Sequence, residues 1–148
     1  MFPHTRLIAV AMALTMSLLF CAQRACAQQR MSDKDIENTM RNLTEDSRKF
    51  QSLFNSAVGK STIRKTSQEK EAKNLVKSFR DQTDGMLKTF ENKRQAEASL
   101  QMVLNSAARI EKQINDISLG GETSTQWSRI KSELATLSEQ FNIPTPRT

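Results

Sequence analysis

Residues 32–59 read SDKDIENTMRNLTEDSRKFQSLFNSAVG, and their apolar side chains recur at steps of four and three. The positions that share this spacing, with Ser47 filling one place, are Ile36, Met40, Leu43, Ser47, Phe50, Phe54 and Ala57. Such spacing gives a helix one apolar stripe. Ser32 is a good N-cap, and Gly59 suits the residue after the last turn. The acidic residues after Ser32 favour the positive end of the helix dipole. The stretch therefore predicts a helix over residues 33–58.

Two further stripes repeat the alternation of four and three. The first consists of Ala72, Val76, Phe79, Thr83, Met86 and Phe90, and the second of Ala96, Leu100, Val103, Ala107, Ile110, Ile114 and Ile117. They predict helices at 67–91 and 96–118, with Gly85 as a site for a bend in the first. The stripes are out of phase, which favours a tight turn near residues 92–95. One continuous helix stays open, because that turn contains no Gly or Pro. Gly120 and Gly121 end the later helix.

The last stripe consists of Trp127, Ile130, Leu134, Leu137 and Phe141. Thr123 and Gln126 have the spacing of a capping box, and two prolines follow the stripe, so a helix is expected at 124–141. Four helices with short connections predict an all-α fold, an up-down-up-down antiparallel four-helix bundle that forms a single domain over residues 28–148. Regular heptad stripes also pair between chains in coiled coils, so a homodimer stays open.

Residues 1–27 have the features of a cleaved secretory signal peptide. A charged start precedes the apolar run from Leu7 to Ala22, and Ala25-Cys26-Ala27 offers small residues where a signal peptidase cuts. Cleavage would leave a mature chain beginning at Gln28, which predicts an exported protein, periplasmic or extracellular, of a bacterial envelope. The alternatives are an uncleaved anchor and a lipoprotein acylated at Cys21, the latter disfavoured by the bulky Phe20. The mature chain has no segment that could span a membrane.

The predicted mature chain contains no cysteine, histidine or tyrosine. Covalent haem, paired iron, zinc hydrolysis and Ser-His-Asp or Cys-His nucleophiles in their usual forms need these residues. Carboxylate pairs remain, but the helix dipole explains Asp33 and Glu37, and solvent exposure explains Asp81 and Asp84. The sequence predicts that the protein is not an enzyme and has no catalytic residues, cofactor or metal site.

The second predicted helix carries a basic face. Four cations recur at steps of three, four and three on this face: Lys70, Lys73, Lys77 and Arg80. Lys60, Arg64 and Lys65 lead into it. This face suits a protein partner or an anionic envelope surface, such as lipopolysaccharide or acidic phospholipid. The competing interpretation is that this face is only exposed to solvent, and that Glu69 and Glu71 reduce its positive charge. Nucleic acid is not expected, because no aromatic residues lie among the basic ones.

Four positions near the stripes carry further expectations. Trp127, the only tryptophan, is expected to seal an end of the bundle with its indole N–H on a loop carbonyl or water, and a ligand or interface role is the alternative. Ser47 and Thr83 either bond back to their own helices or line a small cavity. Met102 is expected to fill the core.

These observations predict an exported, non-enzymatic helical bundle whose work is binding. The first hypothesis is an interaction module or chaperone-like adaptor of the cell envelope that holds a protein partner on the basic face. The alternative is a binder of a small apolar or anionic ligand within or beside the bundle.

Overall fold

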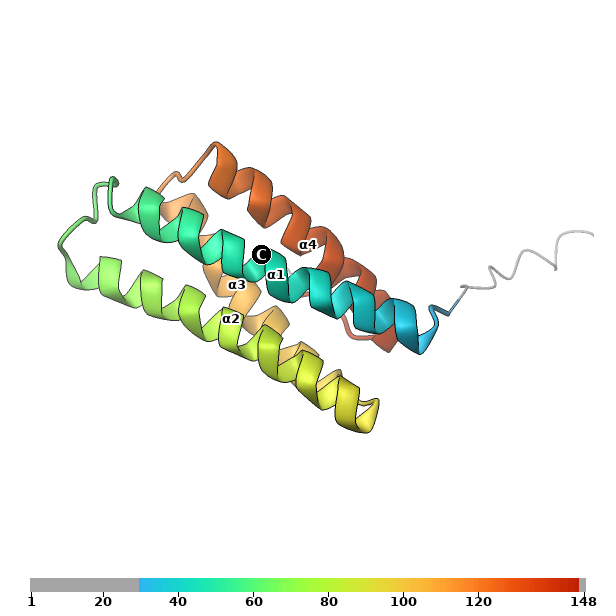
Figure 1. Cartoon of the computed structure of the whole chain (residues 1–148). Coiled ribbons are helices and arrows are strands. Elements are labelled where there is room, and N and C mark those ends of the chain that lie inside the picture. Colours follow the sequence, from blue (N-terminus) through green and yellow to red (C-terminus); the bar gives the residue numbers. More distant parts are fainter. Residues whose placement is uncertain (1–29, 147–148) are drawn as a thin grey trace, which may run out of the picture. The chain divides into compact units, whose positions relative to one another are not determined.

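The computed structural model describes residues 30–146, and within this range it consists of four helices and no strand (Figure 1). α1 spans Asp33–Val58, α2 Ser67–Lys93, α3 Glu97–Asp116 and α4 Glu122–Phe141. The predicted all-α class and its four helices are confirmed. Each helix end lies within two residues of its expected place. The predicted signal peptide, including Cys21, lies outside the described residues.

α1 begins as its sequence predicts, with the Ser32 hydroxyl oxygen accepting a hydrogen bond from the backbone N–H of Asp35 (3.2 Å). The residues that α1 buries are Ile36, Met40, Leu43, Thr44, Ser47, Phe50, Phe54 and Val58. The expected stripe is correct up to Phe54. Its last member is Val58 and not Ala57, because the step after Phe54 is four residues and not three. Gly59 is the C-cap and keeps a right-handed conformation (φ −63°).

α2 begins with a capping arrangement that the sequence analysis missed. The Thr66 hydroxyl oxygen accepts a hydrogen bond from the backbone N–H of Glu69 (3.3 Å), and the Glu69 carboxylate accepts one from the backbone N–H of Lys65 (2.5 Å). Thr66 and Glu69 have the Thr-x-x-Glu spacing of a capping box. Lys65 is left-handed (φ 64°), so the chain turns sharply just before α2.

The expected tight turn between α2 and α3 is confirmed, and the alternative of one continuous helix is wrong. Arg94 adopts a left-handed conformation (φ 52°), and its backbone N–H donates to the Phe90 carbonyl (2.8 Å). A left-handed residue ends a helix even without glycine. α2 itself continues through Gly85 without a break.

The predicted capping box of α4 is wrong. Gly121 is the N-cap, with no side-chain hydrogen bond, and its positive φ of 64° reverses the chain. α4 therefore starts at Glu122, so Thr123 and Gln126 lie inside the helix on its buried side. Gln126 Nε2 donates to the backbone carbonyl of Asp46 on α1 (3.3 Å). The Thr-x-x-Gln spacing here belongs to a packed face and not to a cap.

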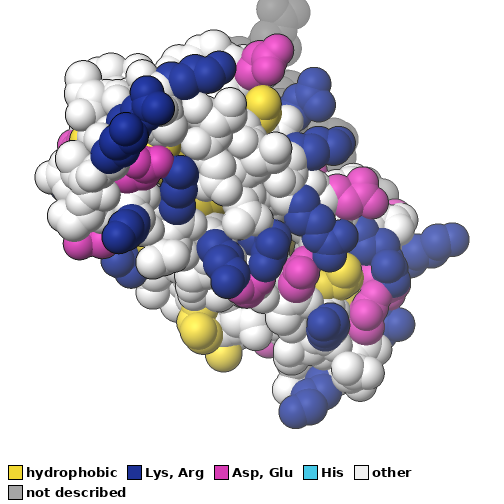
Figure 2. Space-filling view, turned by 60° about the vertical axis from the view of Figure 1, so that its left-hand side comes forward, with side chains coloured by type: hydrophobic (Ala, Val, Ile, Leu, Met, Phe, Trp, Pro, Cys, Tyr) yellow, Lys and Arg dark blue, Asp and Glu magenta, His cyan; other side chains and the backbone are white. Residues whose placement is uncertain are grey.

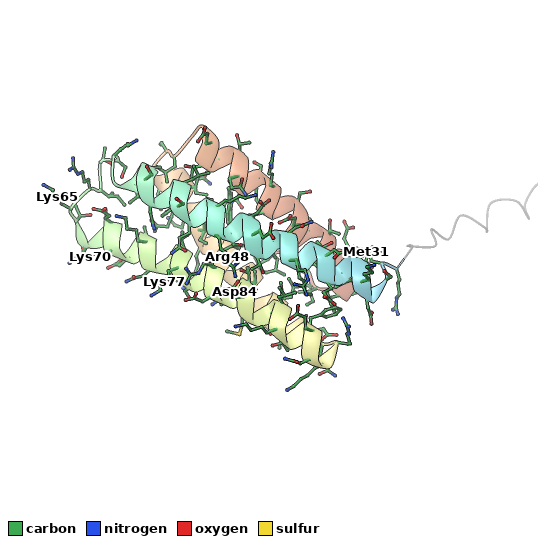
Figure 3. All side chains as sticks on the ribbon, viewed as in Figure 1. Met31, Arg48, Lys65, Lys70, Lys77 and Asp84 are labelled. Atoms are coloured by element: carbon green, nitrogen blue, oxygen red, sulfur yellow. The ribbon has the colours of Figure 1, made fainter. Side chains whose placement is uncertain are left out.

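The packing between helices is uneven. α1 packs against α2 and α4, α2 also packs against α3, and α3 and α4 share the least contact. Three ion pairs join α1 to α2 and its C-cap residue Arg94: Glu37 with Arg94, Arg41 with Glu91, and Arg48 with Asp84. Figure 3 labels the last of these pairs, Arg48 and Asp84. Because the residue numbers rise along α1 as they fall along α2, these two helices run in opposite directions.

An aromatic cluster joins α1, α2 and α4. The Trp127 ring lies 4.9 Å from Phe50 and 5.7 Å from Phe79, measured between ring centroids, and Phe50 lies 5.5 Å from Phe54. Rings at these distances stabilise a core beyond the area that they bury.

The two hydroxyl residues within the stripes bond to their own helices, which confirms one of the two expectations for them. Ser47 Oγ donates to the Leu43 carbonyl (2.6 Å), and Thr83 Oγ1 donates to the Arg80 carbonyl (2.8 Å). Met102 differs from its prediction, because it is 58% exposed. On α3 the buried side is marked by Leu100, Val103 and Leu104, and Met102 lies on the other side.

Candidate functional site

Positive charge is concentrated in one part of the chain, which we call the basic segment, residues 60–81. It contains the α1–α2 loop and the first half of α2, with seven basic and three acidic side chains, a net charge of +4. The remainder of residues 30–146 has twelve basic and thirteen acidic side chains, a net charge of −1. The positive excess of the described chain therefore belongs entirely to this segment.

Within the basic face predicted from sequence, two of the four cations are neutralised. Lys73 forms an ion pair with Glu69, one turn before it on α2 (2.5 Å). Arg80 pairs with Asp81 and also donates to Gln51 Oε1 on α1 (3.1 Å), so it helps to join the two helices. Lys73 and Arg80 therefore already interact with side chains of this chain.

Lys70 and Lys77 form the accessible part of this face. Both are exposed, lie two turns apart on α2, and have no ion pair among the described residues. Figure 3 shows both on the part of α2 nearest the α1–α2 loop, with Lys65 in the loop itself. Of the four cations predicted on this face, Lys70 and Lys77 are therefore the two that are exposed and have no ion pair within residues 30–146.

The α1–α2 loop adds three more cations that are exposed and unpaired within residues 30–146: Lys60, Arg64 and Lys65. The loop is held by its own hydrogen bonds, including Arg64 N–H to the Ser61 carbonyl (3.2 Å) and Thr66 N–H to the Ile63 carbonyl (3.1 Å). Ile63 packs against the core. Figure 2, turned so that this end comes forward, shows Lys and Arg outnumbering Asp and Glu on the visible face.

Glu69 stays ionised beside these cations. The pKa of Glu69 is lowered first by the hydrogen bond from Lys73 and then by the backbone N–H of Lys65. Its negative charge therefore offsets Lys73 but leaves the five unpaired cations, which we call the free cations: Lys60, Arg64, Lys65, Lys70 and Lys77.

Trp127 does not occupy the position that the sequence analysis expected. It is 3% exposed and packs on Phe50 and Phe79, both within the interiors of their helices, and its Nε1–H has no hydrogen-bond partner among the described residues. It therefore neither reaches a loop carbonyl nor acts only as a seal.

A groove lies between α3 and α4, where these helices share the least contact. Its walls are mainly apolar and its volume is about 220 Å³. It is lined by Leu104, Ala107, Ala108, Glu111, Trp127, Lys131, Leu134, Ala135, Thr145 and Pro146. Lys131 on α4 and Glu111 on α3 pair across it (2.6 Å). Neither Ser47 nor Thr83 lines this groove.

Three of the four carboxylates considered for catalysis form ion pairs, and the fourth, Asp33, lies in the first turn of α1. Asp81 pairs with Arg80, and Asp84 pairs with Arg48 on α1. The pKa of Glu37 is lowered by hydrogen bonds from Arg41 and Arg94, so this side chain joins helices besides lying near the N-terminus of α1. Within residues 30–146, no three His, Cys, Asp or Glu side chains are grouped so that they could hold a metal ion.

One carboxyl group has an unusual environment. Burial against α1 and the nearby charge of Asp46 raise the pKa of Glu133 to about 7, while Arg129 and Lys49 oppose this shift. Glu133 Oε2 is buried and has no hydrogen-bond partner in the described part of the chain.

Comparison of the chain with protein families, curated proteins and solved structures finds no match. Among the described residues, no helix combines the length and apolar character needed to cross a membrane. The functional argument therefore depends on the charges, burial and contacts of this chain alone.

Proposed function

We propose that this chain is an exported, non-enzymatic interaction module or chaperone-like adaptor of the cell envelope, which holds an acidic partner protein on the basic segment. The proposal includes removal of residues 1–27 as a signal peptide and the up-down-up-down order of the helices. It assigns no catalytic residue, cofactor or metal.

The observation that carries the proposal is the group of free cations. Lys70 and Lys77 are exposed on α2, and three more free cations lie in the adjoining loop, whereas the rest of the described chain is slightly acidic. Charges concentrated in this way raise the rate at which an oppositely charged partner is captured and orient it. Such exposed contacts are screened by salt, so the binding should weaken as ionic strength rises.

The proposal favours an acidic protein over a lipid surface for a geometric reason. The free cations continue from a loop onto two turns of a straight helix, and the helix supplies fixed spacing that a folded acidic surface can match. An anionic membrane needs charge but no such spacing.

The test is site-specific photocrosslinking in producing cells, with the crosslinking residue placed at Lys70 or Lys77. Asn105, exposed on α3 outside the basic segment, is the matched control. We expect one discrete protein adduct from positions 70 and 77, absent at position 105 and lost in high salt. The mass of the recovered chain should correspond to a start at Gln28. Adducts to lipid, or equal adducts from all three positions, would argue against the proposal.

A second candidate function is the binding of a small ligand beside the bundle. The groove between α3 and α4 favours it, because its walls are mainly apolar and its volume is about 220 Å³.

A further inference from the structure

Four side chains form one stripe on the accessible side of α2, which we call the donor stripe: Ser67, Lys70, Asn74 and Lys77. All four are exposed, and they recur at steps of three, four and three, which keeps them on one side of the helix. Each presents a hydrogen-bond donor, from a hydroxyl, an amide or an ammonium group. The stripe contains no carboxylate, so it suits a partner that presents acceptors.

Apolar contact contributes little at this stripe. The only large hydrophobic side chain exposed within residues 30–146 is Met102, which lies on α3. Ile63 and Leu75 of the basic segment are partly buried and pack against the core. A partner at the donor stripe is therefore held by charge and hydrogen bonds, and salt screens these exposed contacts.

The spacing of the two lysines selects the form of the partner. Lys70 and Lys77 are seven residues apart on α2, so they lie about 10.5 Å apart along its axis and within about 20° of each other around it. Two carboxylates seven residues apart on a second helix have the same spacing and share one side. In a strand, side chains on one side lie about 6.6 or about 13 Å apart. An acidic helix therefore matches both lysines at once, whereas an extended acidic segment does not.

The α1–α2 loop determines the direction of such a helix. Lys60, Arg64 and Lys65 are exposed and have no ion pair within residues 30–146, and they adjoin the end at which α2 begins. The C-terminal end of a helix carries partial negative charge and unpaired carbonyls. Electrostatic attraction therefore favours a partner helix whose C-terminal end lies at the loop. The exposed Asp81 carboxylate, one turn after Lys77, disfavours the opposite direction.

We propose that the partner is bound as an acidic α-helix that lies along the first half of α2, antiparallel to it, with carboxylates seven residues apart paired with Lys70 and Lys77. The C-terminal end of this helix lies at the loop cations. This inference rests on the proposed function and specifies the form and direction of its partner.

The test measures how two helical peptides bind the ¹⁵N-labelled chain from Gln28 to Thr148 in NMR titrations at low salt. Both peptides are rich in alanine and glutamine, neutral at their ends and identical in composition, with one pair of glutamates each. The glutamates of the matched peptide are seven residues apart. Those of the mismatched peptide are five residues apart, which turns them about 140° away from each other. We expect the matched peptide to bind about 2- to 5-fold more tightly, because it forms one more exposed ion pair.

Two variants locate the contact. Lys77→Gln should remove the preference for the matched peptide, whereas Lys93→Gln, the same change at an exposed α2 position outside the basic segment, should retain it. Circular dichroism first establishes that both variants fold.

Spin labels on the matched peptide, each one turn beyond the nearer glutamate, report its direction. A label at the C-terminal end should broaden the amide resonances of Arg64 and Lys65. A label at the N-terminal end should broaden that of Asp81. The reverse pattern would overturn the antiparallel direction.

Equal affinities for the two peptides, with both reduced by Lys70→Glu with Lys77→Glu, would overturn the helical partner and leave the proposed function intact. Absence of binding by both peptides would also overturn the helical partner. The proposed function would fail with it only if crosslinking from Lys70 and Lys77 gave no discrete adduct, so the two failures are distinguishable.

Discussion

Glu133 is a side chain whose environment disfavours its ordinary ionised form. It lies on α4 facing Asp46 and Lys49 of α1, with Arg129 one turn before it, and its pKa is raised to about 7 from 4.5. A carboxyl group with a raised pKa binds its proton more tightly in the folded chain than in the unfolded chain. Its contribution to stability is therefore most favourable at low pH and declines as the pH rises from 4.5 to about 7.

Glu133→Gln should therefore stabilise the fold in a manner that depends on pH. We expect a gain of about 1 kcal/mol at pH 8, well below the value implied by the full shift because the side chain is partly exposed to solvent. The gain should disappear near pH 4, where Glu133 is protonated in both states. Urea denaturation at both pH values measures it, and Glu139→Gln on the exposed side of α4 is the control. A gain that is equal at both pH values would contradict this account.

Other single residues show what a sequence pattern cannot resolve. Thr66 with Glu69 and Thr123 with Gln126 have equivalent spacing, yet only the first pair caps a helix. The difference comes from the positive φ of Gly121, which starts α4 before Thr123 and places this threonine on the buried side. Likewise, the sequence identifies Lys73 as basic but does not show that its side chain forms an ion pair with Glu69.

At the scale of elements, most of the fold could be predicted. The alternation of four and three places each stripe on one side of a helix, so all four helices were found. The errors occur at the ends, where one residue decides the outcome: Val58 in place of Ala57, and the start of α4. The turn at Arg94 was found from the change of phase between stripes, although neither Gly nor Pro marks it.

Two glycines give a test of helix continuation and termination. Gly85 is exposed inside α2, and a Cβ added there would meet no atom within 4 Å. Gly85→Ala should therefore stabilise the fold by about 0.5–1 kcal/mol, because alanine loses less backbone entropy in a helix.

Gly121→Ala makes the matched substitution where φ is 64° and where a Cβ would likewise meet nothing within 4 Å. It should destabilise the fold by about 1–3 kcal/mol through backbone strain alone. Denaturation midpoints of both variants provide the comparison. A loss at Gly85 would contradict the continuous helix assigned there, and no loss at Gly121 would contradict the assigned start of α4.

At the scale of the whole molecule, the proposed function depends on which charges remain unpaired after the helices pack. Sequence alone located the basic face but could not show that Arg80 bridges to Gln51, or that the α1–α2 loop supplies three of the five free cations. It also could not reveal the α3–α4 groove, because the groove reflects how closely two helices approach and not the composition of either one.

The measurement that tests the central proposal most directly compares two double variants of the chain from Gln28 to Thr148 for binding to a polyglutamate peptide. Lys70→Glu with Lys77→Glu reverses two free cations, and Lys88→Glu with Lys93→Glu makes the same change on exposed residues of α2 outside the basic segment. The two double variants have the same net charge as each other, because each replaces two lysines by two glutamates. Circular dichroism must show that they also have the same helical content. We predict that the first pair lowers affinity at low salt by about 10-fold or more, and that the second lowers it by about 2-fold or less. Equal losses would mean that only net charge matters, and they would contradict the proposal that the basic segment is the binding surface.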